Sequence, residues 1–547
     1  MLTYTPPESR LPAPHTYEKP WIGWLLIFAW LWPGVFSHDL WRPSEPWVNE
    51  AVKALLAGGG IWLPTVFDEP YFSVSPVYVW VAAMYRSILS PDITDAYSAM
   101  RFASVTFTAI GLAASNLAGK VFLGRQQNHS VALILIGCAG LIMAGHFLGG
   151  MSVQFAAAGL CLYGLALARK RVIVAATLLG VGWALAALSA GYVMAVCLML
   201  IAFVLPISAA WQVKRYTVSL VGALAVSVPL MLIYPLALYH SSPTAFTWWQ
   251  SYQMLGTFGG TASFSLGWSA WYYLKNLLWF AFPALPLAVW SFSRGQWKQQ
   301  DWGVLAGVWL TLLGALLCVE PIQYQDNLIW LLPPLALLGA AKLDSLRRGA
   351  AAFLNWFGIM TFGLFALFLW LGFLAMNFGF PAKLAERAAY FSPYFVPDID
   401  TMPMLVASLF TPLWLWAITR KHVKGRQAVT NWAAGMTLVW ALLMTLFLPW
   451  LDAAKSYRPV VEHMQAALPT DFAAQQACIQ IEPAAKTIRL AWGEYSDLPL
   501  RLNDRSCRYR LIQTHKQASP PEGWQTVWQG GRPRNREEWF MLLEPQP

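Results

Sequence analysis

The sequence predicts an all-α polytopic membrane protein that ends in a small α/β domain. Of its 547 residues, 57% are hydrophobic and only 12% are charged, whereas soluble domains carry about 25% charged residues. Apolar runs long enough to cross about 30 Å of hydrocarbon recur as far as residue 451. Tryptophan, which concentrates at membrane interfaces, occurs 31 times. The net charge of +10 is spread over short connections, without a basic aromatic patch, which argues against nucleic-acid binding.

About thirteen apolar runs are predicted to span the membrane. They cover residues 21–37, 101–123, 130–148, 153–168, 172–190, 192–212, 217–239, 271–293, 303–320, 328–343, 351–375, 403–419 and 432–451. The first run lacks a following small-x-small cleavage site, so we expect a retained span rather than a signal peptide. Residues 76–91 are expected to form an interfacial or re-entrant helix, because counting them as a span would invert every basic connection that follows.

Alternate connections between the runs are basic, which predicts the orientation of the chain. They contain Lys120, Arg125, Arg169, Lys170, Arg171, Lys214, Arg215, Arg294, Lys298, Lys342, Arg347, Arg348, Arg420, Lys421, Lys424 and Arg426. Cytoplasmic loops carry an excess of Lys and Arg, so these connections and the N-terminus are predicted to be cytoplasmic. An odd number of spans then places the C-terminal tail outside.

The composition changes after residue 451, which divides the chain into a membrane domain, 1–451, and an outside α/β domain, 452–547. Residues 478–482, 487–492, 508–514 and 538–544 have strand-like patterns, and 459–468 is expected to be helical. Cys478 and Cys507 are the only cysteines of this tail. They form either a disulfide or two free thiols, and an oxidising compartment favours the disulfide.

The long polar loop 38–100 carries the candidate chemistry. Acids at a membrane interface that do not set orientation are functional candidates. Glu45 lies just before a helix-like run at 47–57, and Glu50 lies within it. Glu45 has two open interpretations. It has a catalytic role, or Ser44 or Glu45 caps that helix. Asp68 and Glu69 lie in a turn-like segment and are expected to be surface acids.

Three segments of this loop carry a family resemblance. They read P-S-E-P-W-V-N-E at 43–50, G-G-I-W-L-P at 59–64 and Y-F-S-V-S-P-V-Y-V-W at 71–80. This layout resembles the GT-C type glycosyltransferases that use polyprenyl-phosphate sugars, the family 39 group of protein O-mannosyltransferases and lipid A aminoarabinose transferases. The resemblance implies an enzyme of the bacterial inner membrane. It would move a sugar from a polyprenyl-phosphate carrier to a lipid or glycan acceptor on the periplasmic side.

The sequence departs from the family pattern at residues that matter for activity. The family's catalytic aspartate falls on Ser44, and lysines of the family pattern fall on Val74 and Ala190. By the resemblance, Glu45 would take over the aspartate's role with support from Glu50. The cations expected to hold the donor phosphate are Arg42, Lys53 and Arg86, and the open alternative is ordinary attraction to lipid headgroups. The other cations outside the membrane are Arg101, Lys383 and Arg387.

Other functions remain open from the sequence alone. A relative without activity would keep the fold and bind a lipid-linked glycan or a partner enzyme. A lipid or glycan transporter ranks third, because the spans contain few ionisable residues, no paired broken helices and no internal repeat. His38, His146 and His240 could hold a divalent metal with Asp39, but no metal-ligand spacing joins them. No cofactor is expected with certainty.

Overall fold

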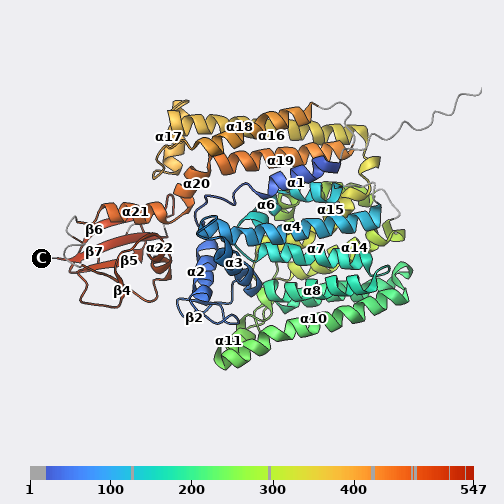
Figure 1. Ribbon diagram of the computed structural model, residues 1–547, viewed down its shortest axis with the longest axis horizontal. Helices are drawn as coiled ribbons and strands as arrows, with labels where there is room; N and C mark the ends of the chain where they lie inside the picture. Colours follow the sequence, from blue (N-terminus) through green and yellow to red (C-terminus); the bar gives the residue numbers. More distant parts are fainter. Residues whose placement is uncertain are drawn as a thin grey trace, which may run out of the picture.

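The molecule is a bundle of helices with a small sheet beyond one end (Figure 1). The computed structural model describes residues 20–124, 129–293, 297–419, 425–469, 472, 477–516, 518–535 and 537–546. The helices up to the middle of the chain are α1 (Pro20–Leu31), α2 (Glu45–Leu56), α3 (Pro76–Leu89), α4 (Ala96–Leu123), α5 (Ser130–Ile136), α6 (Ala139–His146), α7 (Met151–Leu167), α8 (Val172–Ala190), α9 (Tyr192–Val204), α10 (Lys214–Ser241) and α11 (Pro243–Tyr252).

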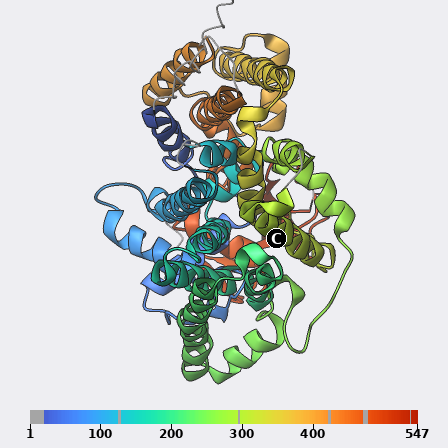
Figure 2. The same ribbon diagram turned by 90° about the vertical axis from the view of Figure 1, so that its right-hand side faces the viewer.

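The second half of the bundle is built in the same way. Its helices are α12 (Ala270–Phe280), α13 (Ala284–Ser293), α14 (Asp301–Cys318), the 3-10 helix η6 (Gln325–Leu331), α15 (Leu332–Ala341), α16 (Arg348–Phe378), α17 (Ala382–Phe391), α18 (Thr401–Ile418), α19 (Gly425–Leu446) and α20 (Leu448–Lys455). Figure 2 views these helices end-on, with the gold and orange α16, α18 and α19 grouped at the top and the green α10 at the bottom.

The predicted class, a multi-pass helical membrane protein, is confirmed. Among the described residues, seven helices are long and apolar enough to cross a membrane, or up to nine if each bent pair counts as one span. The seven are α4, α8, α10, α14, α16, α18 and α19. Most of the other predicted runs form shorter or broken helices, so the total of about thirteen crossings stays a prediction.

Two pairs of helices are sharply bent, which the sequence interpretation did not anticipate. α6 and α7 meet at 113°, and α12 and α13 meet at 100°. Gly149 and Gly150 lie in the first bend, and Pro283, which lacks a backbone N–H, lies in the second. The expectation of no paired broken helices is therefore wrong, and the first break opens beside the first polar loop.

Small residues allow close packing at the centre of the bundle, where α4, α7 and α8 meet. A side chain at Gly159 would lie 2.7 Å from the backbone oxygen of Gly111 on α4. Likewise, a side chain at Gly182 on α8 would lie 2.6 Å from Cys161 on α7. Helices inside lipid associate through such close van der Waals contact, so these glycines hold the scaffold that carries the polar loop.

The first polar loop folds into α2, a short hairpin and α3. The hairpin pairs β1 (Thr65–Val66) with β2 (Glu69–Pro70) in antiparallel fashion. The turn between them uses positive φ angles at Phe67 and Asp68. Asp68 and Glu69 are both exposed, as expected for surface acids. α3 packs on α2 and α4, so the expected helix within 76–91 is present.

The tail folds into a five-stranded sheet covered by two helices. The strands are β3 (Ile479–Ile481), β4 (Leu500–Leu502), β5 (Tyr509–Thr514), β6 (Trp524–Gly531) and β7 (Trp539–Pro545), and the helices are α21 (Arg458–Ala466) and α22 (Lys486–Tyr495). The order is β4-β3-β5-β7-β6, with β3 parallel to β4 and β5 and the other pairs antiparallel.

One strand prediction in this tail is wrong. Residues 487–492 belong to α22 rather than to a strand. Ile488, Ala491 and Trp492 are buried against the sheet at i, i+3 and i+4, which is a helical spacing. The run is too short for its sequence to distinguish the two periods. This helix also brings a polar face toward the first loop.

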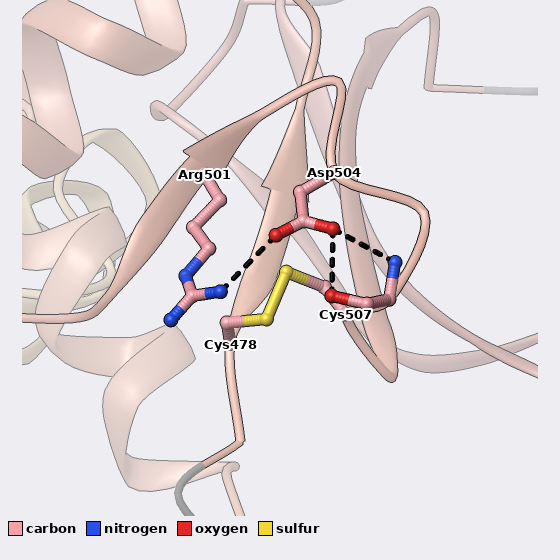
Figure 3. Close-up of a disulfide and its surroundings, with 5 residues drawn as sticks. Cys478, Arg501, Asp504 and Cys507 are labelled. Atoms are coloured by element: carbon pink, nitrogen blue, oxygen red, sulfur yellow. Dashed lines mark hydrogen bonds and ion pairs between the residues drawn. A yellow bond between two sulfur atoms is a disulfide. The ribbon is translucent and has the colours of Figure 1, made fainter.

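Cys478 and Cys507 form a disulfide within this sheet, the bridge that the sequence favoured (Figure 3). The bond joins the residue before β3 to the loop before β5, and both cysteines are buried. Asp504 lies beside it and accepts from Arg501 and Ser506. The bridge closes a sequence separation of 29 residues, and such closure stabilises a small domain by restricting its unfolded chain.

Basic connections meet at the far end of the bundle from the sheet (Figure 1). Arg169 forms an ion pair with Asp301 and donates to the backbone oxygen of Ala210. Arg426 forms an ion pair with Asp344. These pairs tie neighbouring short loops together. Arg125, Arg294, Arg420, Lys421 and Lys424, which contribute to the predicted orientation, lie outside the described residues.

Candidate functional site: the first polar loop and its neighbours

Glu45 lies in a buried ion pair with Arg101. Its side chain is 2% exposed and that of Arg101 is 0% exposed, with Nη2 of the arginine 2.9 Å from Oε2 of the glutamate. Arg101 Nε also donates to Oε1 at 3.4 Å. The backbone N–H of Trp41 donates to Oε2, and that of Leu148 donates to Oε1. Glu45 therefore joins the start of the first loop to α4 and to the bend after α6.

These contacts conflict with both expectations for Glu45. A carboxylate has about four acceptor positions, and here four N–H groups occupy them. No position remains to take a proton from an acceptor substrate, so the geometry favours a structural role over catalysis. Helix capping is wrong as well, because neither Ser44 nor Glu45 makes a side-chain cap to α2.

The positions that depart from the family pattern have different surroundings. Ser44 is exposed at the start of α2. One turn along, Trp47 stacks on Tyr71 with ring centroids 5.2 Å apart and planes 15° apart. Val74 is buried in the core beneath this loop. The face that carries Ser44, Trp47 and Tyr71 therefore lacks a carboxylate at the position where the family pattern has its aspartate.

Two of the three expected phosphate-binding cations are already paired with acids of the tail. Arg42 forms an ion pair with Glu538. Lys53 lies 3.0 Å from Glu494 and 3.3 Å from Glu50. Burial lowers the pKa of Lys53, but the two carboxylates more than offset this, so its pKa lies above the ordinary value. Both cations would have to exchange these partners to hold a phosphate.

Arg86 is more available than Arg42 and Lys53, whereas Glu50 is itself paired with Lys53. Arg86 on α3 donates to the side-chain oxygen of Asn49 at 3.0 Å, and among the described residues no carboxylate pairs with it. Glu50 on α2 is 19% exposed at its side chain and contacts Lys53. Glu50 and Arg86 thus lie on two helices that pack against each other, α2 and α3.

The tail contacts the first loop through a set of ion pairs. Asp39 accepts from Nε and Nη2 of Arg458 at 2.8–3.0 Å. Glu69 pairs with Lys486 at the surface. Together with the pairs of Arg42 and Lys53, these contacts span the loop from its first residues to the hairpin. The tail and the first loop thus lie on the same side of the bundle.

The start of the first loop is titratable but offers no assembled metal site. Burial lowers the pKa of His38, and its Nδ1 lies 3.9 Å from Asp452. Burial and the charge of Asp39 raise the pKa of Asp452 to about 7. His146 is held apart, bonded to the backbone oxygens of Ile142 and Trp30. In the described part of the chain, the histidines do not gather with acids as metal ligands.

Five segments form what we call the outer loop ring: 71–75, 147–150, 188–191, 254–258 and 319–327. Ser75 donates to the backbone oxygen of Leu188 at 3.2 Å, and a side chain at Gly150 would lie 3.1 Å from Ser75. Gly191 and Gly256 both have positive φ, and their backbones touch so closely that no side chain fits at either. The first loop, the bend before α7, and the α8–α9 junction therefore form one surface.

Glu320 is a buried acid on this ring that the sequence interpretation missed. It is 1% exposed and accepts from Thr257, Tyr273 and Asn327. Burial raises its pKa, although these three donors partly offset the effect. No cation among the described residues pairs with Glu320, and a buried carboxylate without a cation is costly, so its presence marks a constrained position. The sequence around Glu320 is a single Glu-Pro pair with no periodic pattern, so it contains no signal that could have identified this acid.

An apolar cavity of about 280 Å³ lies between α3, α8 and α10, next to the ring. Trp62 of the first loop and Trp80 of α3 form one wall. Ala184 and Leu188 of α8 and Tyr234 of α10 form the others. Leu188 belongs to both the cavity and the ring, so the cavity opens an apolar space beside the polar loop. Such a space suits a hydrocarbon chain.

Comparison with known proteins places the chain beside lipid-dependent sugar transferases. No family model matches it. It is 27% identical over 432 residues to undecaprenyl phosphate-alpha-4-amino-4-deoxy-L-arabinose arabinosyl transferases of Pseudomonas aeruginosa (strain LESB58) and Pseudomonas paraeruginosa, covering 75% of this chain and 72% of each relative. ArnT from Cupriavidus metallidurans, solved with bound undecaprenyl phosphate, has a similar fold, with TM-score 0.61 and 14% identity over 95% of this chain and 97% of that chain. The resemblance of the chain to the aminoarabinose transferases is confirmed.

Proposed function

We propose that this protein is an integral-membrane glycosyltransferase that moves a sugar from a polyprenyl-phosphate carrier to a lipid or glycan acceptor. The observation that carries the proposal is the similarity over 432 residues to curated arabinosyl transferases that use an undecaprenyl-phosphate donor. The ArnT-like fold over nearly the whole chain supports it. The first loop and the tail share one side, and the basic connections favour the periplasmic face of a bacterial inner membrane for that side.

The apolar cavity would receive the polyprenyl chain. Its lining is aromatic and aliphatic, and burial of hydrocarbon contributes about 25 cal/mol per Å² of apolar surface. Leu188 places the cavity against the outer loop ring, so a lipid held there would present its phosphate toward polar groups. Other membrane lipids could enter the same cavity. Selectivity for the carrier would then come from recognition of its phosphate group.

The reaction itself needs one acid and one cation near the sugar. The acceptor's oxygen or nitrogen attacks the anomeric carbon, and the bond from that carbon to the phosphate oxygen breaks. The phosphate leaves with the electron pair, where Arg86 would neutralise its charge. Glu50 would take the proton of the acceptor. Lys53 and Arg42 would contribute only after exchanging Glu494 and Glu538 for the phosphate.

A second function is favoured by a specific observation. Ser44, Val74 and Ala190 replace groups of the family pattern, and Glu45 is fully engaged by Arg101 and backbone donors. A relative without activity would keep the cavity and the ionic contacts with the tail while binding a lipid-linked glycan or a partner enzyme. Both functions include binding of the lipid carrier, but only the transferase consumes the sugar donor.

Binding of the carrier provides the test. Titration of the purified protein with undecaprenyl phosphate should change its tryptophan fluorescence saturably, because Trp62 and Trp80 line the cavity. Replacing Arg86 with Gln should weaken this binding about tenfold, the scale of a lost charge-assisted contact. Lys383→Gln on the exposed helix α17 is the matched control and should bind as wild type. Equal affinity for undecaprenol, which lacks the phosphate, would contradict recognition of the donor.

A further inference from the structure

A carboxylate of the tail, Glu494, contacts helix α2 of the first loop, which is far from it in the sequence. Glu494 on α22 accepts from Asn49 at 2.9 Å and from Lys53 at 3.0 Å, both on α2. It also accepts from the hydroxyl of Tyr97 on α4 at 2.6 Å. Its side chain is 13% exposed. A single group of the tail therefore holds two helices of the membrane part together.

A second contact between the same two parts is built differently and provides a comparison. Lys486 of α22 pairs with Glu69 of the hairpin, but their side chains are 39% and 60% exposed. Water screens such exposed pairs, so this contact constrains the chain only weakly. The Glu494 carboxylate is only 13% exposed and accepts from three side chains, one of them charged, and such multiple contacts fix geometry more strongly.

α2 is thus fixed at two places. Glu45 at its start is bound by Arg101 of α4, and Asn49 and Lys53, in its second and third turns, are bound by Glu494. Between these points, α2 presents Trp47, which stacks on Tyr71, and Glu50. A shift of about 1 Å in such groups is enough to impair a transfer step.

We propose that Glu494 is a positioning residue, through which the tail holds α2 at the register that sugar transfer requires. The inference rests on the proposed transferase function. Glu494 acts through Asn49 and Lys53 and does not itself meet the sugar. Its removal should therefore affect turnover rather than the binding of the polyprenyl chain, whose cavity lies between α3, α8 and α10.

The test compares Glu494→Gln with Glu69→Gln in steady-state transfer by the full-length protein. Glu494→Gln should lower kcat about tenfold, with KM for the polyprenyl-phosphate sugar within about twofold. Glu69→Gln should leave both constants near wild type. Amide hydrogen exchange over residues 45–56 should become faster in Glu494→Gln only. The double variant Lys53→Glu, Glu494→Lys exchanges the two charges. It should recover part of kcat and part of the protection of residues 45–56 against hydrogen exchange.

The outcomes separate this inference from the function on which it rests. Unchanged exchange over α2 in Glu494→Gln would overturn the positioning role whether or not transfer is observed. Equal loss of kcat in both variants would also overturn it, because an exposed pair would then matter as much. Absence of transfer by wild type, with faster exchange in Glu494→Gln alone, would refute the transferase function and leave the contact between tail and α2 intact.

Discussion

Replacing Arg101 with Ala is expected to destabilise the protein by about 3–5 kcal/mol, the usual cost of leaving a buried charge without its partner. Arg101 compensates Glu45 and also donates to the backbone oxygens of His38 and Asp39 at 2.6 and 2.8 Å. All these acceptors lie at the start of the first loop. Thermal unfolding of the purified protein in detergent measures the effect, with exposed Arg387→Ala on α17 as the control.

A double-mutant cycle distinguishes this ion pair from a simple loss of packing. Glu45→Ala and Arg101→Ala together should cost less than the sum of the two single changes by about 1–3 kcal/mol, because the double variant leaves no unpaired charge. Additive effects would show that the two groups do not depend on each other. An Arg101→Ala variant as stable as Arg387→Ala would contradict the structural role assigned to Glu45.

Filling the apolar cavity should abolish use of the polyprenyl carrier without unfolding the protein. Ala184 lines the cavity from α8, so Ala184→Trp places an indole in the 280 Å³ that we assign to the lipid. We expect binding of undecaprenyl phosphate to weaken at least about tenfold, because the chain loses the apolar surface it would bury. The measurement is the fluorescence titration, with thermal unfolding as the test of folding.

The matched control lies on the same helix. Ile173 is 81% exposed, so Ile173→Trp adds the same ring outside the cavity and should bind the lipid like wild type. If Ala184→Trp binds as tightly as Ile173→Trp, the polyprenyl chain occupies another place. If both variants lose binding, the effect arises from α8 as a whole and the cavity assignment fails.

Periodic and compositional features were predictable from the sequence. The apolar runs, the helix after Pro43 and the pairing of Cys478 with Cys507 all depend on local pattern. The bend at Pro283 was missed because hydropathy alone treats a broken apolar run as a continuous one, and the bend at 147–150 was missed because the runs on its two sides were each taken as a full span. Residues 487–492 were misassigned because six residues fit both periods.

The candidate site was less predictable because its contacts join distant segments. Glu45 looked catalytic in the loop motif, but its partner Arg101 is 56 residues away. Glu494 reaches Lys53 across 441 residues, and no local pattern connects a helix of the tail to α2. Glu320 gathers Thr257 and Tyr273 from two other segments. Such pairings depend on tertiary packing, which a single sequence does not contain.

The most direct test of the transferase function is the cellular pool of polyprenyl-phosphate-linked sugars, measured by mass spectrometry. A strain that lacks the protein should accumulate one lipid-linked sugar. Wild type and Ile173→Trp should clear it, whereas Ala184→Trp should not. A pool that is the same in all four strains would contradict sugar transfer and favour the relative without activity, which binds a lipid-linked glycan or a partner enzyme.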